Sequence, residues 1–195
     1  KFKEENFCKL QGIFGFYECY KENEKLIVLK PAEYNNAQLD FHFTREKKAP
    51  FRSISDFFLT QETDKTDLII FQIVTIGNKI KADDKKMLEE GSYKDYFFKH
   101  GFSMALTEAL ADFVQSQIIK TLYSNKNNRL ERLETPQNNG LRYSPGFTSC
   151  PNLEDNKKII NLLEAHKIGI TVTESFQMVP EYTTAAFIVL NPMAS

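Results

Sequence analysis

Apolar residues gather in three short segments near the start of the chain. The segments are Gly12 to Tyr20, Lys25 to Lys30 and Gln38 to Phe43, all rich in aromatic or β-branched residues and separated by polar turns. In the third segment every second residue from Leu39 to Phe43 is apolar, which places His42 on a polar face. We therefore predict three strands in a meander, with His42 exposed and not a metal ligand.

Further along, an almost unbroken apolar run from Asp67 to Ile76 predicts a central strand covered on both faces. Ser53 to Phe58 is typical of a short helical turn. The segments Ile170 to Thr173 and Thr183 to Leu190 predict the last two strands.

A helical period of three and four replaces the alternation between Ser103 and Tyr123, within a long helix that we expect to follow Ser92. The predicted core stripe consists of Leu106, Leu110, Phe113, Val114, Ile118 and Leu122. The opposite side carries Ala105, Ala109, Asp112 and Ser116. Small side chains let a ligand or another backbone approach closely. Asp112 is then either a carboxylate facing such a partner or an ordinary exposed helix residue.

Two further helices are expected. A charged, mostly exposed helix should run from Lys79 to Glu90. The second should follow Asn152, a plausible N-cap, and continue from Lys157 to His166 before Gly169 ends it. At a helix C-terminus an imidazole is favourable on electrostatic grounds, so we do not assign His166 to a metal.

Composition limits the classes of function. The chain has 195 residues, 42% of them hydrophobic, and no long polar linker, which indicates one domain. Its formal charge of -1 argues against a nucleic-acid binder, and it has neither a signal peptide nor an apolar run of membrane-spanning length. We expect a cytoplasmic protein. Three widely spaced cysteines predict neither a disulfide framework nor a zinc site. The predicted fold class is α+β, a single domain with a curved, largely antiparallel sheet packed by a long helix and shorter helices.

The stretch from Gly140 to Pro151 combines one arginine, two glycines and two prolines between two helical regions. Prolines and glycines together hold one irregular backbone shape. A rigid loop that carries a fixed guanidinium is suited to gripping a carboxylate through two hydrogen bonds. The other interpretation is a well-formed turn whose Arg142 lies on the surface.

The run Arg142-x-x-Pro145-Gly146-Phe147-x-x-Cys150-Pro151, followed by Thr173-Glu174-Ser175-Phe176-x-Met178-x-Pro180, resembles the C-terminal activation domain of cobalamin-dependent methionine synthase. The resemblance extends back to Ala105, Ala109 and Asp112 on the long helix and covers most of the chain. It implies a domain that binds S-adenosylmethionine (AdoMet), here spanning residues 1–195 and apparently truncated at both ends. A terminal tyrosine and an N-terminal helix of the family have no counterpart.

The resemblance also implies the site residues. Arg142 would hold the AdoMet carboxylate, Asp112 would balance its ammonium, and the backbone of Ser144 and Gly146 would border the adenosine. Phe147 stands where the family usually has tyrosine, so an aromatic face is kept and a hydroxyl is lost. No metal ligands and no catalytic acid, base or nucleophile are expected, because AdoMet brings an activated methyl group and the protein only positions it.

The implied function is reductive reactivation within a methyltransferase. The domain would present AdoMet to a cobalamin held by a separate cobalamin-binding domain, while flavodoxin or another flavoprotein reductase supplies an electron. Two alternatives stay open. One is a non-catalytic interaction module that kept the fold and lost the ligand. The other is a reactivation subunit for another corrinoid protein.

Overall fold

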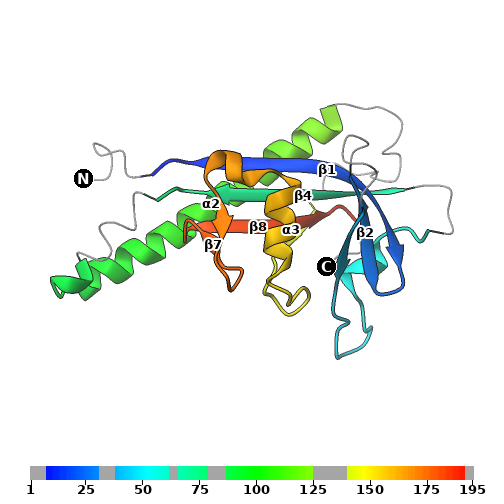
Figure 1. The fold of residues 1–195 in the computed structure, drawn as a ribbon, viewed down its shortest axis with the longest axis horizontal. Coiled ribbons are helices and arrows are strands. Elements are labelled where there is room, and N and C mark those ends of the chain that lie inside the picture. The colour runs from blue at the N-terminus through cyan, green and yellow to red at the C-terminus, as the bar shows by residue number, and fades with distance from the viewer. Residues whose placement is uncertain (1–7, 31–37, 62–65, 79–86, 125–139, 192–195) are drawn as a thin grey trace.

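The computed structural model describes residues 8–30, 38–61, 66–78, 87–124 and 140–191. The helix expected from Lys79 to Glu90 lies largely outside the described residues, and so does the polar connection that the sequence places between Asn125 and Asn139. Within the described ranges, a six-stranded sheet and one long helix organise the molecule (Figure 1).

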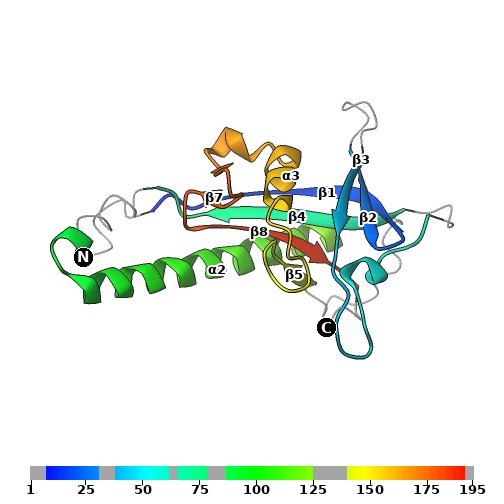
Figure 2. The ribbon, with the colours of Figure 1, turned by 60° about the horizontal axis from the view of Figure 1, so that its bottom comes forward.

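The sheet has the strand order β3-β2-β1-β4-β8-β5, and every neighbouring pair is antiparallel. Its strands are β1 (Gln11–Glu22), β2 (Lys25–Leu29), β3 (Gln38–His42), β4 (Asp67–Thr75), β5 (Leu141–Tyr143) and β8 (Thr183–Val189). The predicted meander and the central strand are confirmed. Figure 2 shows β1 bending, so that β2 and β3 run at a steep angle to β4 and β8.

Helices cover both faces of the sheet. The helix α2 (Tyr93–Ser124) lies on one face, with its first turns extending beyond the strands (Figure 2). The other face is covered by α3 (Asp155–Leu162) and the short 3-10 helix η4 (Ala165–Ile168). A second 3-10 helix, η2 (Ile54–Phe57), follows β3, and β6 (Thr171–Val172) pairs with β7 (Met178–Val179). These elements confirm the predicted α+β class.

The core consists of two layers because β4 is buried on both sides. On the α3 face, the rings of Phe41, Phe71 and Phe187 pack with centroid separations of 5.3 to 5.5 Å. On the α2 face, Ile70 of β4 packs in a cluster that includes Ile118 of the helix. Successive side chains of β4 point to opposite faces of the sheet, so this strand contributes residues to both layers.

The structure corrects three expectations. Phe113 is 60% exposed instead of lying in the core, because the buried face of α2 passes through Ala111 and Gln115, and residues two positions away point to the opposite side of a helix. The helix after Pro151 ends at Leu162, because Glu164 adopts a left-handed conformation with φ 52°. The short strand β7 was not predicted, since two residues carry no readable alternation.

Within the described part of the chain, none of the helices, α2 included, combines the length and the apolar character needed to cross a membrane.

Candidate functional site

Arg142 reaches the α2 side of the sheet because of its register in the edge strand β5. It lies directly opposite Ile188 of β8, and Ile188 belongs to the apolar cluster under α2. Opposed residues of an antiparallel pair point to the same face. Tyr143 points the other way, opposite Phe187, and packs against the main core. Tyr143 therefore contributes to packing on the face opposite Arg142.

The long helix presents two carboxylates to this guanidinium. Arg142 Nη2 donates a hydrogen bond to Glu108 Oε2 at 3.0 Å, and Arg142 Nη1 lies 2.9 Å from Asp112 Oδ1. Glu108 and Asp112 are four residues apart, so they are neighbours on the helix surface, where two like charges repel. The guanidinium between them relieves that repulsion.

Burial differs sharply across this cluster. The Arg142 side chain is 19% exposed, whereas Glu108 is 59% and Asp112 is 73% exposed. Arg142 Nη1 is buried and lacks a hydrogen-bond partner among the described residues, because its contact with Asp112 is close but poorly aligned. A buried donor that lacks an aligned acceptor costs free energy. The arrangement therefore suits a ligand carboxylate that accepts from Nη1, while the exposed oxygens of the two carboxylates are accessible to a ligand cation.

Two glutamine side chains, one on α2 and one on β4, hold the helix, the sheet and β5 in place relative to one another. Gln115 Nε2 donates to the carbonyl oxygen of Gly140 at 3.0 Å, directly before the strand. Gln72 Nε2, on β4, donates to the carbonyl oxygen of Ala111 at 2.9 Å and so anchors the helix to the sheet. Arg142 is thus held by the same helix that carries its carboxylate partners.

The loop after β5 folds back on itself. Gly146 N donates to the Cys150 carbonyl at 2.9 Å, and Cys150 N donates to the Phe147 carbonyl at 3.0 Å. The Cys150 thiol donates to the Ser144 carbonyl at 2.8 Å. Burial raises the pKa of this thiol to about 12, so Cys150 is a packing residue and not a nucleophile. Thr44 Oγ1 also donates to the Thr148 carbonyl at 2.6 Å, which ties the loop to the segment after β3.

Gly146 is required by the backbone of this loop. Its φ is +95°, a conformation that side chains disfavour, and an added Cβ would lie 2.9 Å from Leu153 Cδ2. The neighbouring Phe147 ring is 68% exposed, and Ser144 is half-buried. The loop therefore offers an exposed aromatic face on a fixed backbone.

The second predicted motif forms the turn between β6 and β7. Thr173 N donates to the Gln177 carbonyl at 2.9 Å, and Thr173 Oγ1 lies 3.0 Å from Ser175 Oγ. Asn156 Nδ2 of α3 donates to the Phe176 carbonyl at 3.0 Å. Both motifs are consequently attached to α3, which begins shortly after the first one ends.

The structure brings Arg142 and Asp112 together and places Ser144, Gly146 and Phe147 in the adjoining loop. Glu108, which makes the aligned hydrogen bond, was not singled out from the sequence. Its signal was the spacing of four residues to Asp112 on the same helix.

No cluster of three or more metal-binding side chains occurs in the part of the chain that the structure describes. His166 is exposed at the end of η4, and His42 is 56% exposed beside Asp40.

Comparisons with known proteins point in one direction. Residues 1–195 match the family described as vitamin B12 dependent methionine synthase, activation domain. Over 93% of the chain it is 32% identical to methionine synthase of Mycobacterium tuberculosis and 31% identical to that of Mycobacterium leprae. The chain spans 16% of the length of each of these curated relatives.

A solved structure shares the fold. The crystal structure of the MetH reactivation domain bound to AdoHcy superimposes with a TM-score of 0.80, covering 97% of this chain and 61% of the other at 22% identity. At that identity the likeness supports the architecture alone. Together with the family match over all 195 residues, it leads to one assignment: the chain belongs to the family of vitamin B12-dependent methionine synthase activation domains.

Proposed function

We propose that this domain binds AdoMet and presents its methyl group for the reactivation of a cobalamin cofactor. The observation that carries the proposal is the half-unsatisfied guanidinium of Arg142 between Glu108 and Asp112. Family membership supports it, and the structural neighbour was crystallised with AdoHcy, the product of AdoMet after methyl loss.

The amino-acid end of AdoMet matches this cluster group for group. Its carboxylate would accept hydrogen bonds from Arg142, with Nη1 as the donor that lacks an aligned partner. Its ammonium would lie against Glu108 and Asp112, whose exposed carboxylates remain accessible. The three side chains carry a net charge of -1, and bound AdoMet, with a net charge of +1 that includes its sulfonium, would neutralise it.

The loop after β5 would hold the remaining part of the ligand. The backbone of Ser144 and Gly146 would border the adenosine, because Gly146 has no side chain to block the approach. The exposed Phe147 ring would lie near the sulfonium, where an aromatic face attracts a cation. AdoMet supplies a methyl group already activated by its sulfonium, so the residues of this chain bind and orient it.

The partners in this proposal belong to the longer enzyme and its reductant. A separate cobalamin-binding domain would hold the methyl acceptor. Flavodoxin or another flavoprotein reductase would donate the single electron that oxidised cobalamin needs before it accepts the methyl group. Within an enzyme that methylates homocysteine, the reduced cobalamin of that separate domain would supply the methyl acceptor, and the residues of this chain would hold AdoMet in place and then release AdoHcy.

Isothermal titration with AdoMet tests the proposal. We expect the 195-residue chain to bind with a dissociation constant below about 1 mM, and Arg142→Ala to weaken binding roughly 10- to 100-fold. Lys120→Ala removes an exposed cation elsewhere on α2 and serves as the matched control, with unchanged affinity. If the correctly folded chain shows no heat of binding at millimolar AdoMet, the proposal fails and a non-catalytic interaction module with the same fold takes its place.

A further inference from the structure

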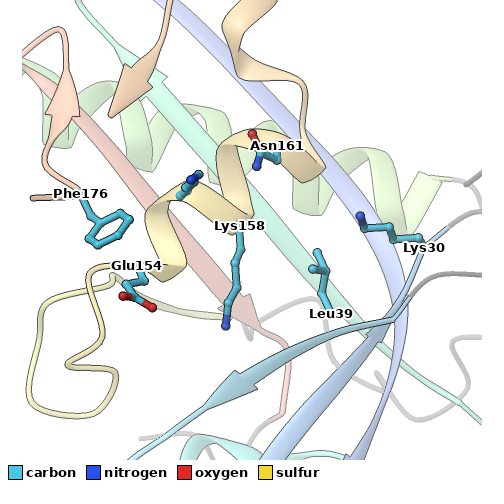
Figure 3. A pocket seen from close by; sticks show the side chains of 7 residues that line it. Lys30, Leu39, Glu154, Lys158, Asn161 and Phe176 are labelled. Carbon is cyan, nitrogen blue, oxygen red and sulfur yellow. The ribbon is translucent and has the colours of Figure 1, made fainter. Parts of the chain in front are cut away.

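A pocket lies on the α3 face of the sheet, opposite the face that Arg142 reaches (Figure 3). Its volume is about 360 Å³, within the size range of small-molecule sites. Three separate parts of the fold line it: the ends of β2 and β3, the helix α3, and the turn between β6 and β7. We propose that this pocket binds a small organic phosphate.

Positive charge is concentrated around the pocket. Lys30, Lys157 and Lys158 line it, against the carboxylate of Glu154 and the buried carboxylate of Asp155, which pairs with Lys158. This excess is local, because the whole chain has a formal charge of -1. In the described part of the chain, neither Lys30 nor Lys157 takes part in an ion pair. Both ammonium groups are therefore available to a bound anion.

Lys158 is the fixed cation of the pocket. Its Nζ donates to the Asp40 carbonyl oxygen at 2.7 Å, pairs with Asp155 Oδ1 at 2.9 Å, and lies 5.1 Å from the centroid of the Phe41 ring. Asp155 is fully buried, so this pairing holds the ammonium in place. An ammonium has three donors, and these contacts use two of them. One donor on a positioned charge remains for a ligand oxygen.

Two apolar side chains also line the pocket. Leu39 and the half-buried ring of Phe176 line it, on either side of α3 in Figure 3. Asn156 fixes the backbone at Phe176 through the hydrogen bond to its carbonyl oxygen. Lysine ammoniums bind phosphate as point charges, and a phosphate ester carries a charge of about -1.5 to -2, which Lys30 and Lys157 would balance while Lys158, already paired with Asp155, adds a hydrogen bond. The apolar side chains beside them favour a phosphate joined to a hydrophobic or planar group over inorganic phosphate.

Phenyl phosphate, inorganic phosphate and inorganic pyrophosphate are suitable probes for titration of the 195-residue chain at constant ionic strength. We expect phenyl phosphate to bind with a dissociation constant in the low millimolar range or below, and more tightly than inorganic phosphate. The double variant Lys30→Gln, Lys157→Gln should weaken phenyl phosphate binding by at least about tenfold. Phe176→Leu should reduce the preference for phenyl phosphate over inorganic phosphate.

The control removes the same charge elsewhere. Lys94→Gln combined with Lys120→Gln changes two exposed lysines of α2 and should leave phenyl phosphate binding unchanged. Arg142→Ala should also leave it unchanged, whatever its effect on AdoMet, which separates this site from the proposed function. The inference is overturned if none of the probes binds at about 10 mM, or if both double variants weaken binding equally. Equal affinity for phenyl and inorganic phosphate would overturn the organic part of the proposal.

Discussion

Arg142 owes its chemical availability to incomplete pairing. One nitrogen of its guanidinium has an aligned hydrogen bond to Glu108, and the other has only a close contact with Asp112. The sequence motif predicts Arg142 and Asp112 as site residues. It could not identify Glu108, because the contact depends on which face of β5 meets α2, and that is set by pairing with β8 more than forty residues away.

At the residue scale we predict that Glu108→Gln and Asp112→Asn each weaken AdoMet binding by roughly 5- to 30-fold. Each removes a carboxylate that would meet the ligand ammonium while preserving side-chain size. Titration calorimetry measures the effect.

The matched control is Asp95→Asn in the first turn of the same helix, about 25 Å from Asp112 at 1.5 Å per residue. It should bind AdoMet as the unaltered chain does. Unchanged affinity in both site variants would mean that the ligand ammonium lies elsewhere.

At the scale of elements, alternation and apolar runs were enough to predict β1 to β4 and β8, because each is long enough to show a period. The sequence predicts a loop where the three-residue strand β5 lies. Three residues are too few to show a period, and they form a strand because they pair with β8. Phe113 was misplaced because the apolar stripe of α2 is broad, and the sheet meets it through Ala111 and Gln115.

The loop after β5 is expected to depend on Gly146. Gly146→Ala should lower the free energy of unfolding by about 1–2 kcal/mol, because φ is +95° and the new methyl would press on Leu153. Thermal and urea unfolding measure this.

Gly101→Ala provides the comparison, since a Cβ added to this helical glycine would meet no neighbouring atom. This variant should raise the free energy of unfolding by about 1 kcal/mol. A Gly146→Ala variant as stable as the parent chain would show that the loop relaxes without strain.

At the scale of the whole molecule, Asp56 joins segments that are far apart in the sequence. Its carboxylate accepts from Arg45 Nη1 at 2.6 Å and from the backbone N–H of Ser53 at 2.9 Å, and it pairs with Lys21 at the end of β1. Arg45 also pairs with Glu24 in the turn between β1 and β2. This network connects the meander to η2. Its residues lie in the first third of the sequence, before those of the proposed AdoMet site.

The Asp56 network should make stability depend on acid pH. The hydrogen bond from Arg45, opposed by desolvation and supported by Lys21 and Ser53, holds the pKa of Asp56 well below its usual range. A depressed pKa gives stability that is present above the unfolded value of about 3.9 and is lost as pH falls below it. Asp56→Asn should therefore lower the free energy of unfolding by about 1 kcal/mol at pH 7, because partial exposure limits the effect. The difference between the variant and the parent chain should shrink progressively below about pH 4. Urea unfolding at several pH values checks this, and a pH-independent difference would contradict it.

The most direct test of the Arg142 site compares two ligands that differ only at the amino-acid end. AdoHcy carries the carboxylate and the ammonium, whereas 5′-methylthioadenosine keeps the adenosine and sulfur without them. We predict that Arg142→Ala weakens AdoHcy binding by roughly tenfold or more and leaves 5′-methylthioadenosine binding unchanged. Equal weakening of both ligands, or of neither, in a variant that unfolds like the parent chain would contradict the assignment of Arg142 to the ligand carboxylate.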